Sequence, residues 1–116
     1  MPYGSLQVWT EEWDGVPVIG AEGEIDLGTV DQFRQTTRDV VGQHPKSLIF
    51  DLRKVSYIDS TGLGVLVAAR RKLASTPEGV VILSGQPSVL QSLRITGLDR
   101  IFKVMEDPSA LCPLRV

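Results

Sequence analysis

The chain opens with two extended runs on either side of a turn signal. The first run covers about Leu6–Trp13 and the second about Val16–Glu22, with Asp14 and Gly15 between them. An Asp-Gly pair readily adopts the positive φ angles of a tight two-residue turn. This segment therefore predicts an antiparallel β-hairpin at the start of the fold.

A helix is predicted next, with signals at both of its ends. Side chains suited to a buried face recur at helical spacing, at Val30, Phe33, Thr37, Val40 and Val41. Thr29 and Gln32 have the spacing of a capping box, in which each side chain bonds to the backbone N–H of the other residue. Gly42 fits the C-terminal end of the helix.

The rest of the chain alternates between strand-like and helix-like segments. Strands are predicted at Leu48–Leu52, Val80–Leu83 and Ile101–Val104. Helices are predicted from Ser60 to about Leu73, at about Pro87–Ile95, and briefly after Asp107. The order β-β-α-β-α-β-α-β-α is typical of an α/β fold. We expect a mixed, four- to five-stranded sheet that begins with the hairpin and is packed with helices.

Composition excludes several classes of function. The 116 residues are 42% hydrophobic and 22% charged, and we expect a single domain over 1–116 with its core at about 6–111. A formal net charge of -2 provides no positive field for phosphate backbones, so nucleic acid is not an expected partner. No run approaches the ~18 apolar residues of a membrane span, and no signal peptide is visible. The single cysteine, Cys112, cannot form an internal disulfide, which fits a cytoplasmic location.

The strongest functional signal lies between the strand at Leu48–Leu52 and the helix that follows it. Residues 57–66 read YIDSTGLGVL, which places the Ser60 hydroxyl at a helix N-terminus beside Asp59. A hydroxyl at this position can cap the helix, accept a phosphoryl group, or do both at different times. A plain cap is the simpler interpretation of Ser60, although Thr61 is equally able to cap.

Two glycines in the first turn of the same helix need an explanation. Gly62 and Gly64 each cost about 1 kcal/mol relative to alanine in a helix. Their presence indicates that another group approaches the backbone closely. A dinucleotide-binding loop is poorly supported, because its third glycine or alanine would fall at Val67.

An enzymatic serine would need a base, and the chain offers one histidine. His44 lies in a turn between Gly42 and Pro45. In a parallel sheet this turn falls at the strand end opposite Ser60, so we expect the two side chains to be far apart. The sequence contains no Gly-x-Ser-x-Gly elbow and no cluster of metal ligands. It therefore predicts no catalytic, cofactor-binding or metal site.

The first strand carries two tryptophans. Trp9 and Trp13 lie four residues apart and therefore share one face of the strand. Packing in the core or on the sheet is the default interpretation. A partner-binding surface is the alternative, because exposed tryptophans often anchor interfaces.

The segment Asp59-Ser60-Thr61-Gly62-Leu63-Gly64-Val65 after a buried strand resembles the phosphorylation site of the anti-anti-sigma factors. These are the stand-alone anti-sigma factor antagonists of the STAS family (sulfate transporter and anti-sigma factor antagonist). The predicted order of elements, from about Leu6 to Leu111, is similar to the STAS fold, so the resemblance implies a single STAS domain. Residues 22–26, EGEID, resemble a Gly-Glu-Leu-Asp-like segment of the family. The predicted last helix is shorter than is usual in the family.

The resemblance implies a regulatory protein that is not an enzyme. Ser60 would be the phosphorylation site, within a partner-binding face made of Asp26, Asp59, Ser60, Thr61, Gly62 and Leu63. The unphosphorylated form would bind an anti-sigma factor that is a serine kinase, and so free a sigma factor for transcription. The kinase would use ATP and Mg²⁺, and a PP2C-type phosphatase would reverse the reaction. The chain itself would hold no cofactor and would be a monomer or weak dimer.

One expectation concerns how phosphorylation acts. A phosphate on Ser60 would meet free N–H groups at the positive end of the helix dipole, so we expect it to block docking without remodelling the fold. The alternative function is a STAS adaptor or scaffold that binds a protein partner or small ligand without being phosphorylated.

Overall fold

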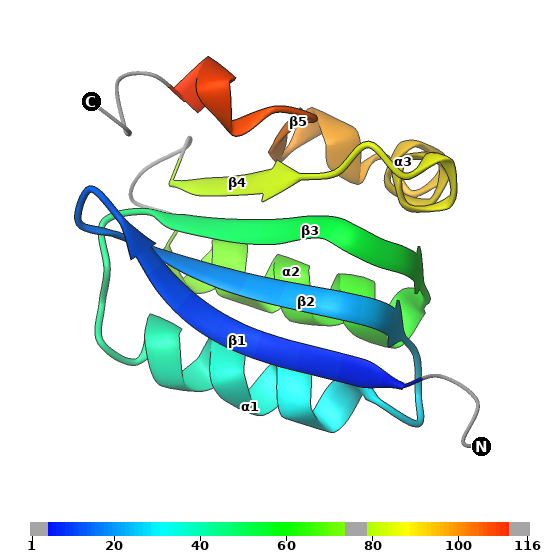
Figure 1. The fold of residues 1–116 in the computed structure, drawn as a ribbon, viewed down its shortest axis with the longest axis horizontal. Coiled ribbons are helices and arrows are strands. Elements are labelled where there is room, and N and C mark those ends of the chain that lie inside the picture. Colours follow the sequence, from blue (N-terminus) through cyan, green and yellow to red (C-terminus); the bar gives the residue numbers. More distant parts are fainter. Residues whose placement is uncertain (1–4, 74–78, 112–116) are drawn as a thin grey trace.

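A computed structural model describes residues 5–73 and 79–111 (Figure 1). The elements of these residues are β1 (Leu6–Trp13), β2 (Val16–Ile25), α1 (Val30–Val41), β3 (Leu48–Ile58), α2 (Ser60–Lys72), β4 (Val80–Leu83), α3 (Pro87–Ile95), a 3₁₀ turn (Leu98–Arg100), β5 (Lys103–Met105) and a second 3₁₀ turn (Pro108–Leu111). The order confirms the predicted α/β fold, with a 3₁₀ turn in place of the short last helix. Cys112 lies outside the described residues.

The described strands form one five-stranded sheet in the order β1-β2-β3-β4-β5. β1 is antiparallel to β2, and every later neighbour is parallel. Asp14 and Gly15 have φ angles of 51° and 84°, as the two-residue turn requires, which confirms the hairpin. Because β2 and β3 run in the same direction, the loops that lead from them into α1 and α2 lie side by side at one end of the sheet (Figure 1).

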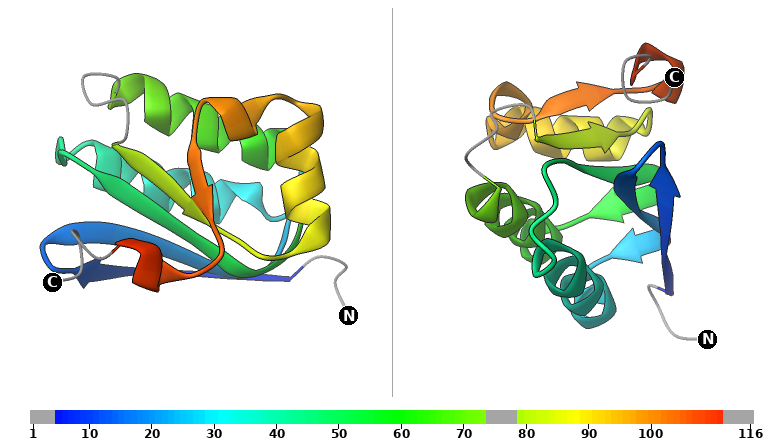
Figure 2. Two further views of the ribbon diagram at one scale, coloured as in Figure 1. Left: turned by 90° about the horizontal axis from the view of Figure 1, so that it is seen from above. Right: turned by 90° about the vertical axis from the view of Figure 1, so that its left-hand side faces the viewer.

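The helices α1 and α2 pack against the same face of the sheet (Figures 1 and 2). The main core forms between these layers, and Val89 and Leu93 of α3 belong to it. Phe33 of α1 packs on Phe50 of β3, with the ring centroids 5.7 Å apart. This shared core fixes the N-terminal ends of α1 and α2 relative to the strands that precede them.

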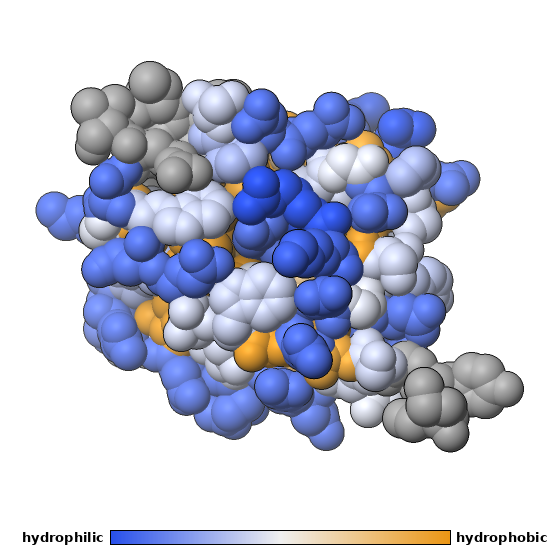
Figure 3. Space-filling model, in the orientation of Figure 1, coloured by the Kyte–Doolittle hydropathy of each residue, from blue (hydrophilic) through white to orange (hydrophobic). Residues whose placement is uncertain are grey.

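The opposite face of the sheet carries a smaller apolar cluster of Val16, Val18, Ile49, Val81 and Leu83. Trp9 lies over Gly20 of β2, where a Cβ would come within 2.3 Å of the indole. Trp13 packs against the cluster, and the Arg53 guanidinium lies 5.9 Å from its ring centroid. Figure 3, which views this face, shows hydrophobic residues mainly in gaps between hydrophilic ones. Both tryptophans therefore pack on the sheet, as expected.

β3 shows the largest difference from the predicted elements. The apolar pattern predicts a strand that ends at Leu52, whereas β3 continues to Ile58. Its second half pairs with residues 20–25 of β2 through two shifts in register. Each shift interrupts the alternation of buried and exposed side chains, so this segment lacks the period of two by which a strand is recognised.

The capping box predicted at the start of α1 is wrong. Thr29 is the N-cap residue, but its side chain makes no cap hydrogen bond. The Thr29 hydroxyl donates instead to the carbonyl of Glu24 (2.7 Å) and accepts from the N–H of Asp26 (3.0 Å). It therefore ties the end of β2 to the start of α1, and it satisfies backbone groups that need hydrogen-bond partners.

Candidate functional site

The candidate site lies where β3 leads into α2. Asp59 is the N-cap of α2 and has an extended backbone. Its Oδ1 accepts hydrogen bonds from the N–H groups of Thr61 (2.9 Å) and Gly62 (3.2 Å). The hypothesis that Ser60 or Thr61 caps this helix is therefore wrong. A carboxylate is the stronger acceptor because its charge complements the positive end of the helix dipole.

Asp59 also joins this loop to the one between β2 and α1. Its Oδ2 accepts a hydrogen bond from the N–H of Leu27 (3.1 Å), and its own N–H donates to the carbonyl of Ile25 (3.0 Å). Burial raises the pKa of Asp59, but hydrogen bonds from the Thr61 hydroxyl and from three backbone N–H groups outweigh burial and hold the pKa below its ordinary value. Asp59 is therefore an ionised bridge between the two loops at neutral pH.

Ser60, the first residue of α2, is exposed. Among the residues that the structure describes, its hydroxyl has no hydrogen-bond partner. The reason is that Asp59 already satisfies the N–H groups that a serine cap would serve. The Ser60 oxygen is consequently open to solvent and to any protein that docks there.

The N-terminus of α2 is less receptive to an anion than the sequence suggests. The N–H groups of the two residues after Ser60 bond to the Asp59 carboxylate, and that of Leu63 bonds to the Asp59 carbonyl (3.0 Å). The expectation that a phosphate on Ser60 meets a set of free N–H groups is therefore wrong. A phosphate there would instead add negative charge next to an existing carboxylate.

Thr61 has a different environment from its neighbour Ser60. Its side chain is half-buried, and its hydroxyl donates to Oδ1 of Asp59 at 2.5 Å. Thr61 therefore shapes the turn through Asp59 and does not cap the helix itself. Of the two adjacent hydroxyls, Ser60 is the one left without a structural role.

Gly62 and Leu63 lie beneath the surface of the site. A Cβ at Gly62 would come within 2.6 Å of Ile25 and 2.7 Å of Ile58, so the close approach inferred from this glycine is made by the chain's own sheet. At Gly64, by contrast, a Cβ would meet no atom within 4 Å. Gly62 therefore allows α2 to lie close to the sheet, whereas Gly64 does not serve packing.

Asp26 organises the loop beside the site. Its Oδ1 accepts a hydrogen bond from the N–H of Gly28 (2.9 Å), and its carbonyl accepts from the N–H of Val30 (2.9 Å). The Leu27 bond to Asp59 brings this loop to the start of α2. The structure thus brings the Asp26 segment to the candidate site, while the Asp26 carboxylate is engaged within its own loop.

Two exposed apolar residues adjoin Asp59, and only one of them, Tyr57, falls within the segment 57–66 singled out in the sequence. Leu27 is 77% exposed and Tyr57 is 46% exposed. Single exposed apolar residues are common, but the N–H of Leu27 bonds to Asp59, and Tyr57 precedes Asp59 by two residues near the end of β3. The signal for Leu27 in the sequence is an apolar residue inside the polar turn Asp26-Leu27-Gly28.

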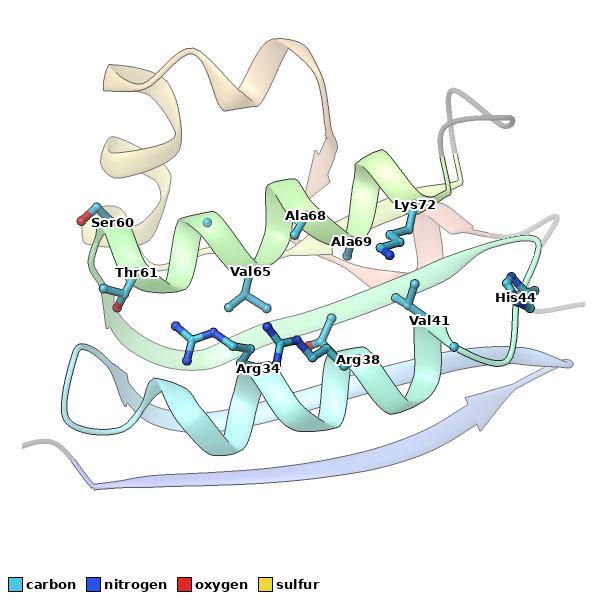
Figure 4. A pocket seen from close by; sticks show the side chains of 13 residues that line it. Arg34, Arg38, Val41, His44, Ser60, Thr61, Val65, Ala68, Ala69 and Lys72 are labelled. Atoms are coloured by element: carbon cyan, nitrogen blue, oxygen red, sulfur yellow. The ribbon is translucent and has the colours of Figure 1, made fainter.

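A groove runs between α1 and α2, with Ser60 and Thr61 among its lining residues. Figure 4 places His44 and Ser60 at opposite ends of this groove, which confirms their expected separation. His44 is therefore too far away to act as a base for Ser60. Within residues 5–73 and 79–111, no group of three or more His, Cys, Asp or Glu could hold a metal ion. The same residues include no helix with the length and hydropathy needed to cross a membrane.

Fold and site together define a small α/β domain with an exposed serine at the start of the helix that follows a central parallel strand. Residues 7–110 match the STAS domain, and the chain belongs to that family.

Several relatives of this chain are named anti-sigma factor antagonists. It is 30% identical over 100 residues to the anti-sigma-F factor antagonist RsfB of Mycobacterium tuberculosis, covering 86% of this chain and 81% of RsfB. It is also 30% identical to the anti-sigma-B factor antagonist of Listeria monocytogenes, covering 86% and 87% of the two chains. A crystal structure of an anti-sigma factor antagonist from Mycobacterium paratuberculosis superposes with a TM-score of 0.88 at 32% identity, covering 97% and 96%. The resemblance noted in the sequence is therefore confirmed.

Proposed function

We propose that this chain is an anti-sigma factor antagonist that acts by binding and is switched off by phosphorylation of Ser60. The observation that carries the proposal is the Ser60 hydroxyl, which is exposed and has no hydrogen-bond partner within the described part of the chain, because Asp59 caps the helix. The names of the relatives support it. In its unphosphorylated form the chain binds an anti-sigma factor, and this binding frees a sigma factor for transcription.

The chain is the substrate of the phosphoryl transfer and not its catalyst. The Ser60 oxygen attacks the γ-phosphorus of ATP, ADP leaves, and a base of the kinase takes the hydroxyl proton. Mg²⁺ and ATP are held by the anti-sigma factor, which is the serine kinase. A PP2C-type phosphatase returns the hydroxyl by hydrolysis and releases inorganic phosphate. We place this cycle in the cytoplasm, where ATP is available.

The docking face surrounds the exposed serine. Leu27 and Tyr57 supply apolar anchors, and Asp59 supplies a fixed negative charge. Apolar anchors with a polar rim are the usual composition of a protein interface. Gly62 and Leu63 contribute from beneath, because their packing sets the position of Ser60.

Phosphorylation blocks docking through charge and bulk. It adds about -1.5 to -2 charges next to ionised Asp59, and a partner that covers the face would have to desolvate them. Unpaired buried charges cost several kcal/mol, which is enough to lower affinity about a thousandfold. The core beneath α2 contains none of these groups, so the fold persists.

The test combines phosphate mapping with binding. Incubation with candidate anti-sigma factor kinases and ATP, followed by mass spectrometry, is expected to place one phosphate on Ser60. Ser60→Ala should bind the anti-sigma factor without being modified, Ser60→Asp should bind it weakly, and Thr61→Val should still be phosphorylated. A chain that binds its partner tightly and is never phosphorylated would instead be an adaptor. A main phosphate on Thr61 would also overturn the proposal.

The docking face has its own matched control. Leu27→Asp introduces a charge at a residue that is 77% exposed, and Ile95→Asp does the same on α3, where Ile95 is 75% exposed. We expect Leu27→Asp to lower affinity for the anti-sigma factor at least about tenfold and Ile95→Asp to leave it unchanged. Equal effects of the two changes would show that the face lies elsewhere.

A further inference from the structure

The groove between α1 and α2 has the size of a small-molecule site. Its volume is about 630 Å³, within the range of about 300–1,000 Å³ typical of ligand pockets. It runs along both helices from Ser60 to His44 (Figure 4). Nothing in the docking mechanism proposed above uses its central part.

Positive charge converges on this groove from both helices. Arg34 and Arg38 lie along the side of α1 that borders the groove, and Lys72 extends from α2 toward α1 (Figure 4). Its described lining residues include no Asp or Glu. Arg34 pairs with the exposed Asp31 (2.7 Å), whereas Arg38 and Lys72 form no ion pair within the described residues.

A buried hydroxyl in the same groove lacks a partner. Thr37 is 4% exposed, and its Oγ1 makes no hydrogen bond among the residues that the structure describes. Basic residues near helix C-termini are explained by the helix dipole, but the dipole does not explain a buried hydroxyl left unsatisfied. The hydroxyl lies on the face of α1 that carries Arg34 and Arg38, where a polar atom of a ligand would satisfy it.

The walls of the groove are apolar between the charges. Val41 of α1 and Val65 and Ala69 of α2 line it, and all three are buried. We propose that the groove binds a small amphiphilic anion, in which a phosphate or carboxylate group is attached to a short apolar body. The anionic group lies between Arg38 and Arg34 within reach of Thr37, and the apolar body lies along Val65.

A ligand bound in the groove also affects the proposed phosphorylation site. Ser60 and Thr61 line the same groove, so a bound anion changes the surface that a kinase meets. This consequence rests on the proposed function, whereas ligand binding itself does not. A direct binding measurement needs no kinase, and its outcome is therefore independent of whether Ser60 is phosphorylated.

The test titrates the full chain with hexyl phosphate and with hexanoate, followed by amide NMR. We expect both anions to shift signals of Arg38, Thr37 and Val65 at millimolar concentrations. Inorganic phosphate, 1-hexanol and hexylamine should bind much more weakly, because each lacks one half of the amphiphile. The anion that binds tighter shows which of the two head groups, phosphate or carboxylate, the groove favours.

Substitutions distinguish a specific binding site from non-specific attraction of anions to positive charge. Arg38→Gln should weaken binding at least about tenfold, and Arg71→Gln, on an exposed residue of α2 outside the groove, should leave it within about twofold. Thr37→Val should weaken binding while keeping or raising Tm, because it removes an unsatisfied hydroxyl. Absence of binding, equal binding of hexylamine, or equal losses in Arg38→Gln and Arg71→Gln would overturn the proposal.

Discussion

The connections at the C-terminal ends of β2 and β3 both begin with an aspartate after an isoleucine, but they use their hydroxyl groups in opposite ways. Before α1, the Thr29 hydroxyl forms hydrogen bonds with the backbone of Glu24 and Asp26 and so holds the loop together. Before α2, the carboxylate of Asp59 takes over the helix N–H groups and holds the Thr61 hydroxyl as well. The Ser60 hydroxyl therefore forms no hydrogen bond among the described residues.

The comparison shows that a hydroxyl at a helix start stays free of hydrogen bonds only where another residue caps the helix. The first turn of a helix needs an acceptor for its N–H groups, and Ser or Thr usually provides it. Where a carboxylate provides it, the neighbouring serine is released for chemistry. Asp59 therefore has two effects: it secures the start of α2 and it leaves Ser60 exposed.

The largest expected effect concerns the close approach of α2 to the sheet. Gly62→Ala would place a Cβ 2.6–2.7 Å from Ile25 and Ile58, and we expect it to destabilise the protein by about 2 to 3 kcal/mol through overpacking. Gly64→Ala is the matched control, because it enters open space and gains up to about 1 kcal/mol of helix propensity. Chemical denaturation measures both. Equal changes in the two variants would show that Gly62 does not set the helix position.

The next effect compares the two loops directly. Asp59→Ala removes the cap of α2 and the bridge to Leu27, and we expect a loss of about 2 kcal/mol in the free energy of unfolding. Thr29→Val removes a hydroxyl that does not cap α1, and we expect a loss of about 1 kcal/mol. A larger loss for Thr29→Val than for Asp59→Ala would reverse the comparison.

The same two variants should respond differently to pH. Because the folded-state pKa of Asp59 is lowered, its carboxylate contributes stability that is fully present above about pH 4, the ordinary range of an aspartate, and is lost as pH falls through the lowered value. The difference in unfolding free energy between wild type and Asp59→Ala should therefore shrink below about pH 4. The difference for Thr29→Val should stay constant, since a hydroxyl does not titrate there. A pH-independent Asp59→Ala difference would contradict an ionised cap.

The smallest effect belongs to Ser60. Ser60→Ala should change the free energy of unfolding by less than about 0.5 kcal/mol, because its hydroxyl holds no bond within the described structure. Thr61→Val should cost more, since it removes the hydroxyl that donates to Asp59. Thermal denaturation of the two variants side by side is sufficient. If Ser60→Ala proved the more costly change, Ser60 would have a structural role after all.

Much of the fold could be predicted because several segments carry a single clear pattern. The hairpin has its Asp-Gly turn, Val80–Leu83 is a continuous apolar run, and Pro87–Ile95 begins at a proline. The second half of β3 could not be predicted, because its bulged pairing with β2 removes the period of two. Thr29 is the N-cap of α1 as predicted, but the side-chain bonds of its capping box are absent, and the cap of α2 is Asp59 and not Ser60 or Thr61. Several residues near each helix start have a suitable side chain, and only the folded loop selects among them.

What the sequence determined by itself is the α/β order of elements, the STAS membership and the position of Ser60 at the start of a helix. These depend on local patterns of apolar residues, turn residues and a short motif. Only the tertiary structure decided that Asp59 caps α2, that Leu27 and Tyr57 stand exposed beside it, and that Arg38, Lys72 and the Thr37 hydroxyl share one groove. The physical reason is that each of these arrangements joins segments distant in the chain, which come together when α1 and α2 pack on the same face of the sheet.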